Sequence, residues 1–220
     1  MKFGKNIKGV ILDIDGVLLD SMGIWKDLGA RYLAKRGVEP EAGLGETLFS
    51  MSMEQGASYL KQAYGLENTP EEIKADLEAM LRSFYFHEVR SKEGAKELLD
   101  ALDKAGVKMA AATSSPREHV EAALERNGLL TYICRLFTSA EVGSSKHSPE
   151  IYDAAANHLG LANDEVCVFE DSLYALRTAA NAGYHTVGVY DASGETDQRG
   201  LEDSAEVYVR SLTELRRLFN

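Results

Sequence analysis

The sequence has few cysteines, few prolines and no long apolar run. Its 220 residues include two cysteines and four prolines. Two cysteines are too few for a fold that depends on disulfide bonds. Cys134 and Cys167 each lie inside an apolar stretch, so we expect both to be buried, reduced thiols. Residues 1–6 lack the apolar core of a signal peptide, and no segment approaches the length of a membrane span. We therefore expect a soluble, cytoplasmic protein.

Basic residues are also in the minority. Lys and Arg total 24 against 35 Asp and Glu, which gives a formal net charge of -11. Such a charge disfavours nucleic acid and anionic membranes as partners. The five histidines show no metal-ligand spacing, and 45% hydrophobic residues suffice for one well-buried core. The expected partner is a small molecule.

Short apolar runs typical of β-strands recur along the chain, and most are separated by stretches with helical periodicity. The runs are residues 9–14, 107–113, 133–138, 166–170, 185–190 and 206–209. This alternation predicts an α/β fold, with a parallel sheet covered by helices on both faces.

Three helix starts can be read from local signals. Ser115-Pro116-Arg117-Glu118 has the capping-box pattern with proline at the first helical position, and Ser148-Pro149-Glu150 opens a helix in the same way. A third helix follows Asp171-Ser172 and ends near Gly183. The acidic, glycine-containing residues 191–203 predict an exposed connection.

A long helical insertion separates the first two predicted strands. Residues 22–36, 43–64 and 70–87 have helical patterns, and the next core helix is expected at 94–104. A crossover helix alone would not need so many residues. The sequence therefore predicts a core formed by 1–19 plus 89–220 and a separate helical lobe at 20–88.

Two acidic residues follow the first predicted strand, Asp13 and Asp15, with Gly16 directly after them. Alternate positions on a strand point the same way, so both carboxylates are expected in one small volume. Like charges this close indicate a hard cation such as Mg²⁺, or catalysis by a carboxylate pair. Gly16 fits a sharp turn away from the strand.

Polar residues also follow three other predicted strands. They are Thr113-Ser114-Ser115, a loop with Lys146, and Glu170-Asp171. Ligands of open α/β sheets bind beyond the carboxyl ends of the strands, and this set of donors and carboxylates suits Mg²⁺ beside a phosphoryl group. Each group also has a simpler explanation. Asp13 and Asp15 could form a solvated strand end, and Lys146 could be an ordinary surface lysine. Ser115, Glu170 and Asp171 could cap the helices that follow them.

The motifs, taken in order, resemble those of the haloacid dehalogenase-like (HAD) phosphohydrolases whose helical cap is inserted after the first strand. The resemblance covers the whole chain. It rests on Asp13-x-Asp15-Gly16-Val17-Leu18-x-Asp20-Ser21, on Thr113, on Lys146 with Ser148-Pro149-Glu150, and on Glu170-Asp171-Ser172. The lysine loop departs from the family's usual Gly-Lys-Pro, because it reads Ser145-Lys146-His147. The resemblance implies a Rossmann-like core with a cap at 20–88.

The resemblance also implies residue roles. Asp13 matches the nucleophile that becomes an aspartyl phosphate, and Asp15 matches the general acid–base. Lys146 would steady the nucleophile and the phosphate. Thr113 would bind the phosphoryl oxygens. Beside it, the glycine turn and the donors at the helix start make Gly16, Ser114 and Ser115 further expected phosphate-binding residues. The cofactor would be Mg²⁺, held by Asp13, by Asp15 through its backbone carbonyl, and by Glu170 and Asp171.

Three reactions compete within the family. Dehalogenases lack the second aspartate, so Asp15 disfavours dehalogenation. β-Phosphoglucomutase-like members carry a cap histidine and a cap arginine. This chain has Trp25 in place of the histidine, and the place of the arginine falls within residues 50–54, with Met53 as its expected counterpart. An indole cannot shuttle a proton and a thioether cannot pair with phosphate. We therefore favour Mg²⁺-dependent hydrolysis of a small phosphorylated metabolite, such as a sugar phosphate. The mutase reaction and a non-catalytic phosphate- and Mg²⁺-binding module are the alternatives.

Substrate specificity is expected from the cap. Its candidates are Trp25, Ser50, Met51, Ser52, Glu54 and Gln55, with Trp25 and Ser52 as the favoured pair. For Trp25 and the methionines, packing of the cap's own core is an equally good explanation. Because the site would be complete in one chain, a monomer is expected.

Overall fold

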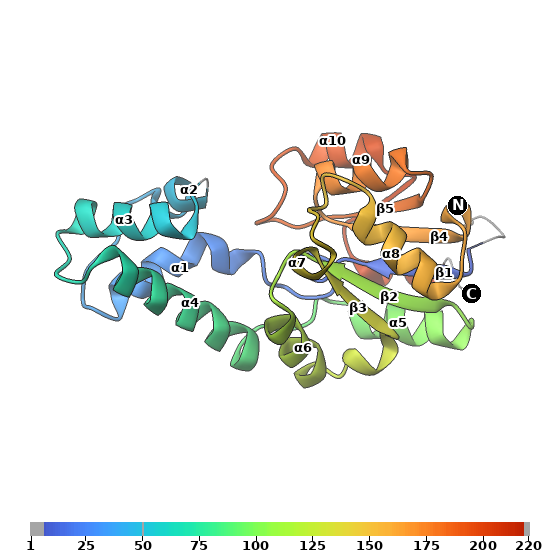
Figure 1. The fold of residues 1–220 in the computed structure, drawn as a ribbon, viewed down its shortest axis with the longest axis horizontal. Helices are drawn as coiled ribbons and strands as arrows, with labels where there is room; N and C mark the ends of the chain where they lie inside the picture. Colours follow the sequence, from blue (N-terminus) through green and yellow to red (C-terminus); the bar gives the residue numbers. More distant parts are fainter. Residues whose placement is uncertain (1–6, 50, 218–220) are drawn as a thin grey trace. The chain divides into compact units, whose positions relative to one another are not determined.

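The computed structural model describes residues 7–49 and 51–217, which form two compact units. The core unit comprises the described chain up to Ser21 and from Val89 onward, and the helical unit is Met22–Glu88. Figure 1 shows the labelled strands of the sheet in the core unit. Each unit is described by itself below.

The core unit is built on a parallel sheet of six strands, with the order β3-β2-β1-β4-β5-β6. The predicted α/β class with a Rossmann-like sheet is confirmed. The strands are β1 Gly9–Leu12, β2 Lys108–Thr113, β3 Arg135–Thr138, β4 Val166–Glu170, β5 His185–Val189 and β6 Val207–Val209. β1 pairs with both β2 and β4, so it is central and its four residues are fully buried, as their apolar sequence requires.

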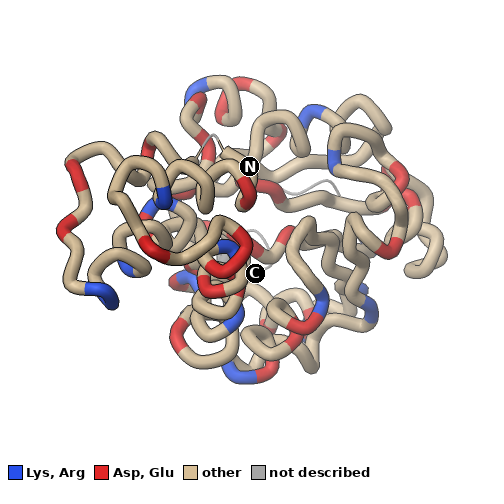
Figure 2. The backbone as a smooth tube through the Cα atoms, turned by 60° about the vertical axis from the view of Figure 1, so that its left-hand side comes forward, with Lys and Arg blue, Asp and Glu red and all other residues tan. Residues whose placement is uncertain are grey.

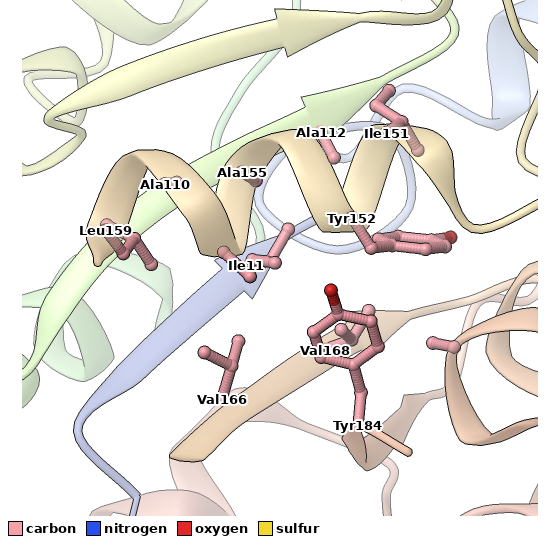
Figure 3. Packing of buried hydrophobic residues seen from close by; sticks show 12 residues of the cluster. Ile11, Ala110, Ala112, Ile151, Tyr152, Ala155, Leu159, Val166, Val168 and Tyr184 are labelled. Carbon is pink, nitrogen blue, oxygen red and sulfur yellow. The ribbon is translucent and has the colours of Figure 1, made fainter. Parts of the chain in front are cut away.

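Helices cover both faces of this sheet (Figure 1). α8 packs on β1, β2 and β3, α9 packs on β4 and β5, and α5 packs on β2. Figure 3 shows the contact under α8, where Ile11, Ala110 and Ala112 of the strands meet Ile151 and Ala155 of the helix. Small alanines on alternate positions of β2 leave room for the helix. The helices of the core unit are α5 Ala95–Lys104, α6 Arg117–Arg126, α7 Ser139–Val142, α8 Glu150–Leu159, α9 Leu173–Asn181 and α10 Gln198–Ser204, with 3₁₀ turns η1 Leu130–Tyr132, η2 Asn163–Glu165 and η3 Leu212–Arg217.

Helices begin where they were predicted, but Pro116 and Pro149 are N-cap residues rather than the first helical residues, and the predicted serine caps are wrong. α6 begins at Arg117 behind Pro116 without a side-chain cap, because the Ser115 hydroxyl is bonded elsewhere. α8 likewise begins behind Pro149 without one, and the Ser148 hydroxyl lies 2.7 Å from that of Ser144. Proline at these positions presets the helical entry, so the helices start without the capping hydroxyl.

The helical unit consists of α1 Gly23–Ala34, α2 Leu44–Phe49, α3 Met53–Tyr64 and α4 Pro70–His87. The single helix expected over 43–64 is wrong, because Ser52 is extended and begins α3 with a capping box to Gln55. Thr69 and Glu72 form a second capping box at α4. Tyr32, Leu60, Ile73 and Leu77 are buried in this unit, so it has a small core of its own.

Two further expectations are corrected. Cys134 is exposed, because it lies just before edge strand β3, whereas Cys167 in β4 is buried. Residues 191–203 are not simply an exposed connection, since Asp191 is buried and residues from Gln198 onward form α10. No helix in the described ranges is long and apolar enough to cross a membrane. Acidic positions outnumber basic ones along the backbone (Figure 2).

Candidate active site

The candidate site lies where the strand order reverses. Successive connections place β2 and β3 on one side of β1, and then β4 and β5 on its other side. The register pairs Leu12 with Phe169, and the Asp13 N–H donates to the Phe169 carbonyl at 3.0 Å. The next residue in each of the two strands' segments is an acid: Asp13 directly follows β1, and Glu170 is the last residue of β4. Neighbouring parallel strands lie about 4.8 Å apart, so register alone brings these carboxylates together.

Asp13, Glu170 and Asp171 form a buried carboxylate cluster, which we call the acidic trio. One oxygen from each lies within 4.8 Å of the others. Lys146, carried by the loop between α7 and α8, lies with its Nζ 2.5 Å from Asp13 Oδ1 and 2.7 Å from Glu170 Oε1. Its side chain is only 4% exposed. The lysine is therefore a buried counter-ion of two trio members, rather than the surface lysine that its sequence context alone suggests.

Burial and the repulsion of neighbouring carboxylates raise the pKa values of Asp13 and Asp171. Burial raises the pKa of Asp171 to about 8, and the charge of Glu170 adds to this rise. Burial also raises the pKa of Asp13, an effect that the Lys146 ammonium opposes. Burial lowers the pKa of Lys146, but Asp13 and Glu170 outweigh it, so the net shift is upward and the ammonium stays charged.

The trio fits a hard divalent cation. Among the described residues, Glu170 Oε2 and Asp171 Oδ2 are buried side-chain oxygens without a hydrogen-bond partner. Buried, unpartnered carboxylate oxygens are costly unless something compensates them. Oxygen ligands of this kind are those that Mg²⁺ prefers. Three carboxylates with one ammonium also leave a local excess of negative charge that a dication would neutralise.

A second group of side chains surrounds Asp15. Ser21 donates to Asp15 Oδ1 at 2.6 Å, and Ser115 donates to Asp15 Oδ2 at 2.6 Å. The Thr113 hydroxyl lies 3.5 Å from the same Oδ2 and accepts the Ser115 N–H at 3.0 Å. Asp15 is thus held by hydroxyl groups from the connections that follow β1 and β2, whereas Asp13 is held by the ammonium of Lys146. The two carboxylates stand in different chemical surroundings.

Comparison with known proteins gives the family. The sequence profile of haloacid dehalogenase-like hydrolases matches residues 7–183. The chain belongs to this family. The resemblance to this family that the motifs indicate is confirmed. The expectation of an enzyme is also confirmed, since the family consists of hydrolases and the curated relatives described next are named phosphatases.

Two curated relatives and one crystal structure show which proteins this HAD-like hydrolase is similar to. It is 25% identical over 181 residues to the phosphorylated carbohydrates phosphatase of Thermotoga maritima, covering 82% of this chain and 84% of the relative. It is 27% identical over 210 residues to the validoxylamine A 7'-phosphate phosphatase of Streptomyces hygroscopicus subsp. limoneus, covering 95% and 96%. The crystal structure of a β-phosphoglucomutase-like protein from Thermotoga maritima superposes with a TM-score of 0.85 at 24% identity, covering 96% and 100%, which shows a common fold.

The remaining candidate residues of the HAD-like hydrolase are not all drawn together. Gly16 forms the expected sharp turn, with a φ of 77°. The Ser114 hydroxyl lies 3.3 Å from that of Ser139, outside the Asp15 group. In the helical unit, Trp25, Met51 and Ser52 line a small, largely apolar pocket with Met53 and Leu60.

The polar candidates of the helical unit are engaged locally. The Ser52 hydroxyl accepts the Gln55 N–H at 3.2 Å, and the Gln55 side chain accepts the Ser52 N–H at 2.9 Å. The Glu54 carboxylate lies 2.5 Å from the Lys74 ammonium. Ser50 lies outside the described residues. Contact of this group with substrate stays a prediction.

Sequence reasoning missed three residues of the HAD-like hydrolase that support the site. The fully buried Tyr152 of α8 donates its hydroxyl to Glu170 Oε1 at 2.8 Å, and Figure 3 shows its ring among the apolar cluster under the helix. Lys92 and Asp191 pair at 2.9 Å beside the Gly16 turn. An apolar-patterned helix predicts a buried ring for Tyr152, but no local signal predicts what its hydroxyl bonds.

Proposed function

We propose that this chain is a Mg²⁺-dependent phosphomonoester hydrolase that works through an aspartyl phosphate on Asp13. The observation that carries the proposal is the pairing of Asp13 with the buried Lys146, beside Glu170 and Asp171 at the switch point of the sheet. The family match of a HAD-like hydrolase supports it. The helical unit would act as the cap, with the boundaries expected from the sequence near residues 20 and 88.

Asp13 would attack phosphorus with its carboxylate. Repulsion between a carboxylate and a phosphate dianion opposes this attack, so positive charge must lie beside both. Lys146 Nζ lies 2.5 Å from the Asp13 carboxylate and can offer a remaining N–H to a phosphoryl oxygen. Because it is buried and paired, the ammonium is oriented before substrate arrives.

Asp15 would move the proton. It would protonate the leaving oxygen when the phosphorus–oxygen bond breaks, and it would then take a proton from the water that attacks the aspartyl phosphate. Ser21 and Ser115 each donate to one of its oxygens at 2.6 Å, which holds its carboxyl group in one orientation. We propose Thr113, Ser114, Ser115 and the Gly16 turn as phosphoryl-binding groups beside it.

Mg²⁺ would be held by the acidic trio and by the Asp15 backbone carbonyl. When bound, it supplies charge neutralisation and polarisation of the phosphoryl group. The buried oxygens Glu170 Oε2 and Asp171 Oδ2 are the observation that favours a cation here. Tyr152 and Lys146 both bond the other oxygen of Glu170, which leaves Oε2 available.

The substrate class that we propose is a small phosphorylated carbohydrate or polyol. Two relatives are named as phosphatases of phosphorylated carbohydrates and of validoxylamine A 7'-phosphate. Trp25 offers a flat apolar surface in the helical unit, which suits the C–H face of a sugar ring, and we propose Trp25 and Ser52 as specificity residues.

The test is a panel of phosphomonoesters assayed for phosphate release with and without MgCl₂. Glucose 6-phosphate, sorbitol 6-phosphate, glycerol phosphate, phosphoglycolate and p-nitrophenyl phosphate span ring, chain and aryl leaving groups. We expect release only with the metal, with kcat/KM highest for a sugar or polyol ester. Absence of release from every ester would favour a binding module. Rapid conversion of β-glucose 1-phosphate to glucose 6-phosphate, with a trace of the bisphosphate, would favour the mutase.

A further inference from the structure

Lys92 uses all three of its N–H groups inside the core unit. Its Nζ donates to the Gly16 carbonyl at 2.8 Å, to the Tyr190 carbonyl at 2.7 Å and to Asp191 Oδ2 at 2.9 Å. The side chains of Lys92 and Asp191 are 17% and 5% exposed. An exposed ion pair between a lysine and a carboxylate is usually mobile and weak. A mostly buried ammonium whose three N–H groups all donate hydrogen bonds instead fixes the groups around it. We call Lys92 with Asp191 the clamp.

One end of the clamp fixes the turn that follows the proposed nucleophile. The Gly16 carbonyl accepts from Lys92, and the Gly16 N–H donates to the Leu19 carbonyl at 3.0 Å. Both polar groups of the Gly16 backbone are therefore held. Since Gly16 directly follows Asp15, the clamp sets the direction of the peptide chain that leaves Asp13 and Asp15.

The other end of the clamp fixes a turn beside Asp171. Asp191 Oδ1 accepts the N–H groups of Ser193 at 2.8 Å and Gly194 at 3.0 Å. A Cβ placed on Gly194 would lie 2.8 Å from Asp171 Oδ2, which is one of the unpartnered oxygens of the acidic trio. The turn that Asp191 shapes thus lies directly against a proposed metal ligand.

We propose that the Lys92–Asp191 clamp is a positioning device that holds the Asp13-to-Gly16 turn and Asp171 at the spacing the divalent cation requires. Both residues act through other groups and neither touches the reacting atoms. The inference rests on the metal site of the proposed function. It extends the site to two residues from the connection before α5 and the connection after β5.

Removing the charge of Lys92 could also act on the cation directly, and this effect would change the Mg²⁺ affinity in the opposite direction. Removing an ammonium near a cation site relieves repulsion and would tighten Mg²⁺ binding. Removing a positioning contact would weaken it, and loss of a group that orients metal ligands typically costs about 10- to 100-fold in metal affinity. Lys92→Met therefore separates the two effects. Asp191→Asn keeps the Oδ1 acceptor for both backbone N–H groups and removes the partner of Lys92.

The experiment titrates MgCl₂ into the full chain by calorimetry, for the wild type, for both single variants and for the double variant. We expect both single variants to bind Mg²⁺ at least about tenfold more weakly. The double variant should bind no more weakly than the worse single variant, because the two residues act as one unit. Lys96→Met is the matched control, since Lys96 forms an exposed pair with Asp100 four residues along the chain, and it should bind like the wild type.

Each outcome decides something. Unchanged or tighter binding by Lys92→Met, or unchanged binding by Asp191→Asn, overturns the clamp. If Lys92→Met does not fold, as judged by circular dichroism, Lys92→Gln, which also removes the ammonium charge, takes its place with the same expected weakening of Mg²⁺ binding. A wild type that binds no Mg²⁺ overturns the clamp together with the metal site. Binding by the wild type without any phosphatase activity overturns the proposed function and leaves the clamp to be decided by the variants.

Discussion

Replacing Lys146 by methionine removes the buried counter-ion of the acidic trio. Methionine has a similar length and no charge, so the change isolates the ammonium. In the native chain this group lies 2.5 Å from Asp13 and 2.7 Å from Glu170, and the lysine side chain is 4% exposed. The variant would bury three neighbouring carboxylates without their lysine.

The expected loss of stability follows from that geometry. Removing one partner of a buried ion pair costs about 3–5 kcal/mol, because the other partner stays buried and uncompensated. The carboxylates can relieve the cost by binding protons, so the loss should be smaller at pH 5 than at pH 8. A dication bound to the trio would replace the missing charge, so MgCl₂ should recover part of the loss.

The assay is urea unfolding of wild type and Lys146→Met in EDTA at pH 5 and pH 8, and again with MgCl₂. Lys96→Met, which removes an exposed lysine from α5, should leave the free energy of unfolding unchanged. A loss under about 1 kcal/mol at pH 8, or a loss that does not depend on pH, would refute the reasoning that Lys146 compensates buried charge.

Three further predictions concern pH, a hydroxyl and a backbone turn. Burial raises the pKa of Asp171 from 3.8 to about 8, so its contribution to stability is complete below pH 3.8 and is lost as pH rises through about 8; thermal unfolding in EDTA should show this loss at up to about 1.4 kcal/mol per pH unit. Tyr152→Phe removes a buried hydroxyl that donates at 2.8 Å to the Glu170 carboxylate, and urea unfolding should show a loss of about 1.5–3 kcal/mol. Gly94→Ala should lower the melting temperature, because Gly94 has a φ of 82° and a Cβ there would lie 2.6 Å from the Thr213 backbone nitrogen.

Matched variants give each of these predictions its control. Asp171→Asn cannot titrate, so a pH dependence equal to that of the wild type would contradict the first. Tyr152→Phe keeps the packed ring, and a loss below about 0.5 kcal/mol would show that its hydroxyl contributes little. Gly106 has a φ of 70° with open space around its Cβ position, so Gly106→Ala should cost less than Gly94→Ala; equal losses would mean that crowding at residue 94 is unimportant.

The strands could be predicted from sequence because each is a short apolar run with a turn signal after it. β4 was expected at 166–170 and is Val166–Glu170, and β5 was expected at 185–190 and is His185–Val189. The order of the strands could not be obtained in this way, since pairing of β1 with both β2 and β4 depends on contacts between residues far apart in the chain.

The acidic residues of the site were found from sequence, but their surroundings were not. Asp13 and Asp15 were expected to share one volume by strand alternation. β1 ends at Leu12, Asp15 forms only an isolated bridge with Leu19, and the Leu18 and Leu19 N–H groups donate to the Ile14 carbonyl, so the chain turns directly after Asp15. The charge of Asp15 contributes to raising the pKa of Asp13, so the two carboxylates act on each other, but Asp13 has Lys146 as its partner and Asp15 has hydroxyls, which the strand pattern does not indicate.

Residues that act through long-range contacts gave no local signal. Lys92 donates to a backbone carbonyl 76 residues earlier and to a carboxylate 99 residues later. Asp191 lies in a segment whose acidic, glycine-containing composition indicates a surface loop. Only the folded chain shows that these two charges meet in a mostly buried place beside Asp171.

Phosphate release by Asp13→Asn tests the central claim most directly. The asparagine keeps the size of the side chain and removes the carboxylate that would attack phosphorus. With saturating MgCl₂ and p-nitrophenyl phosphate, the wild type should release phosphate and the variant should be slower by at least about a thousandfold. A variant that folds, binds Mg²⁺ and still turns over near the wild-type rate would contradict the assignment of Asp13 as the nucleophile.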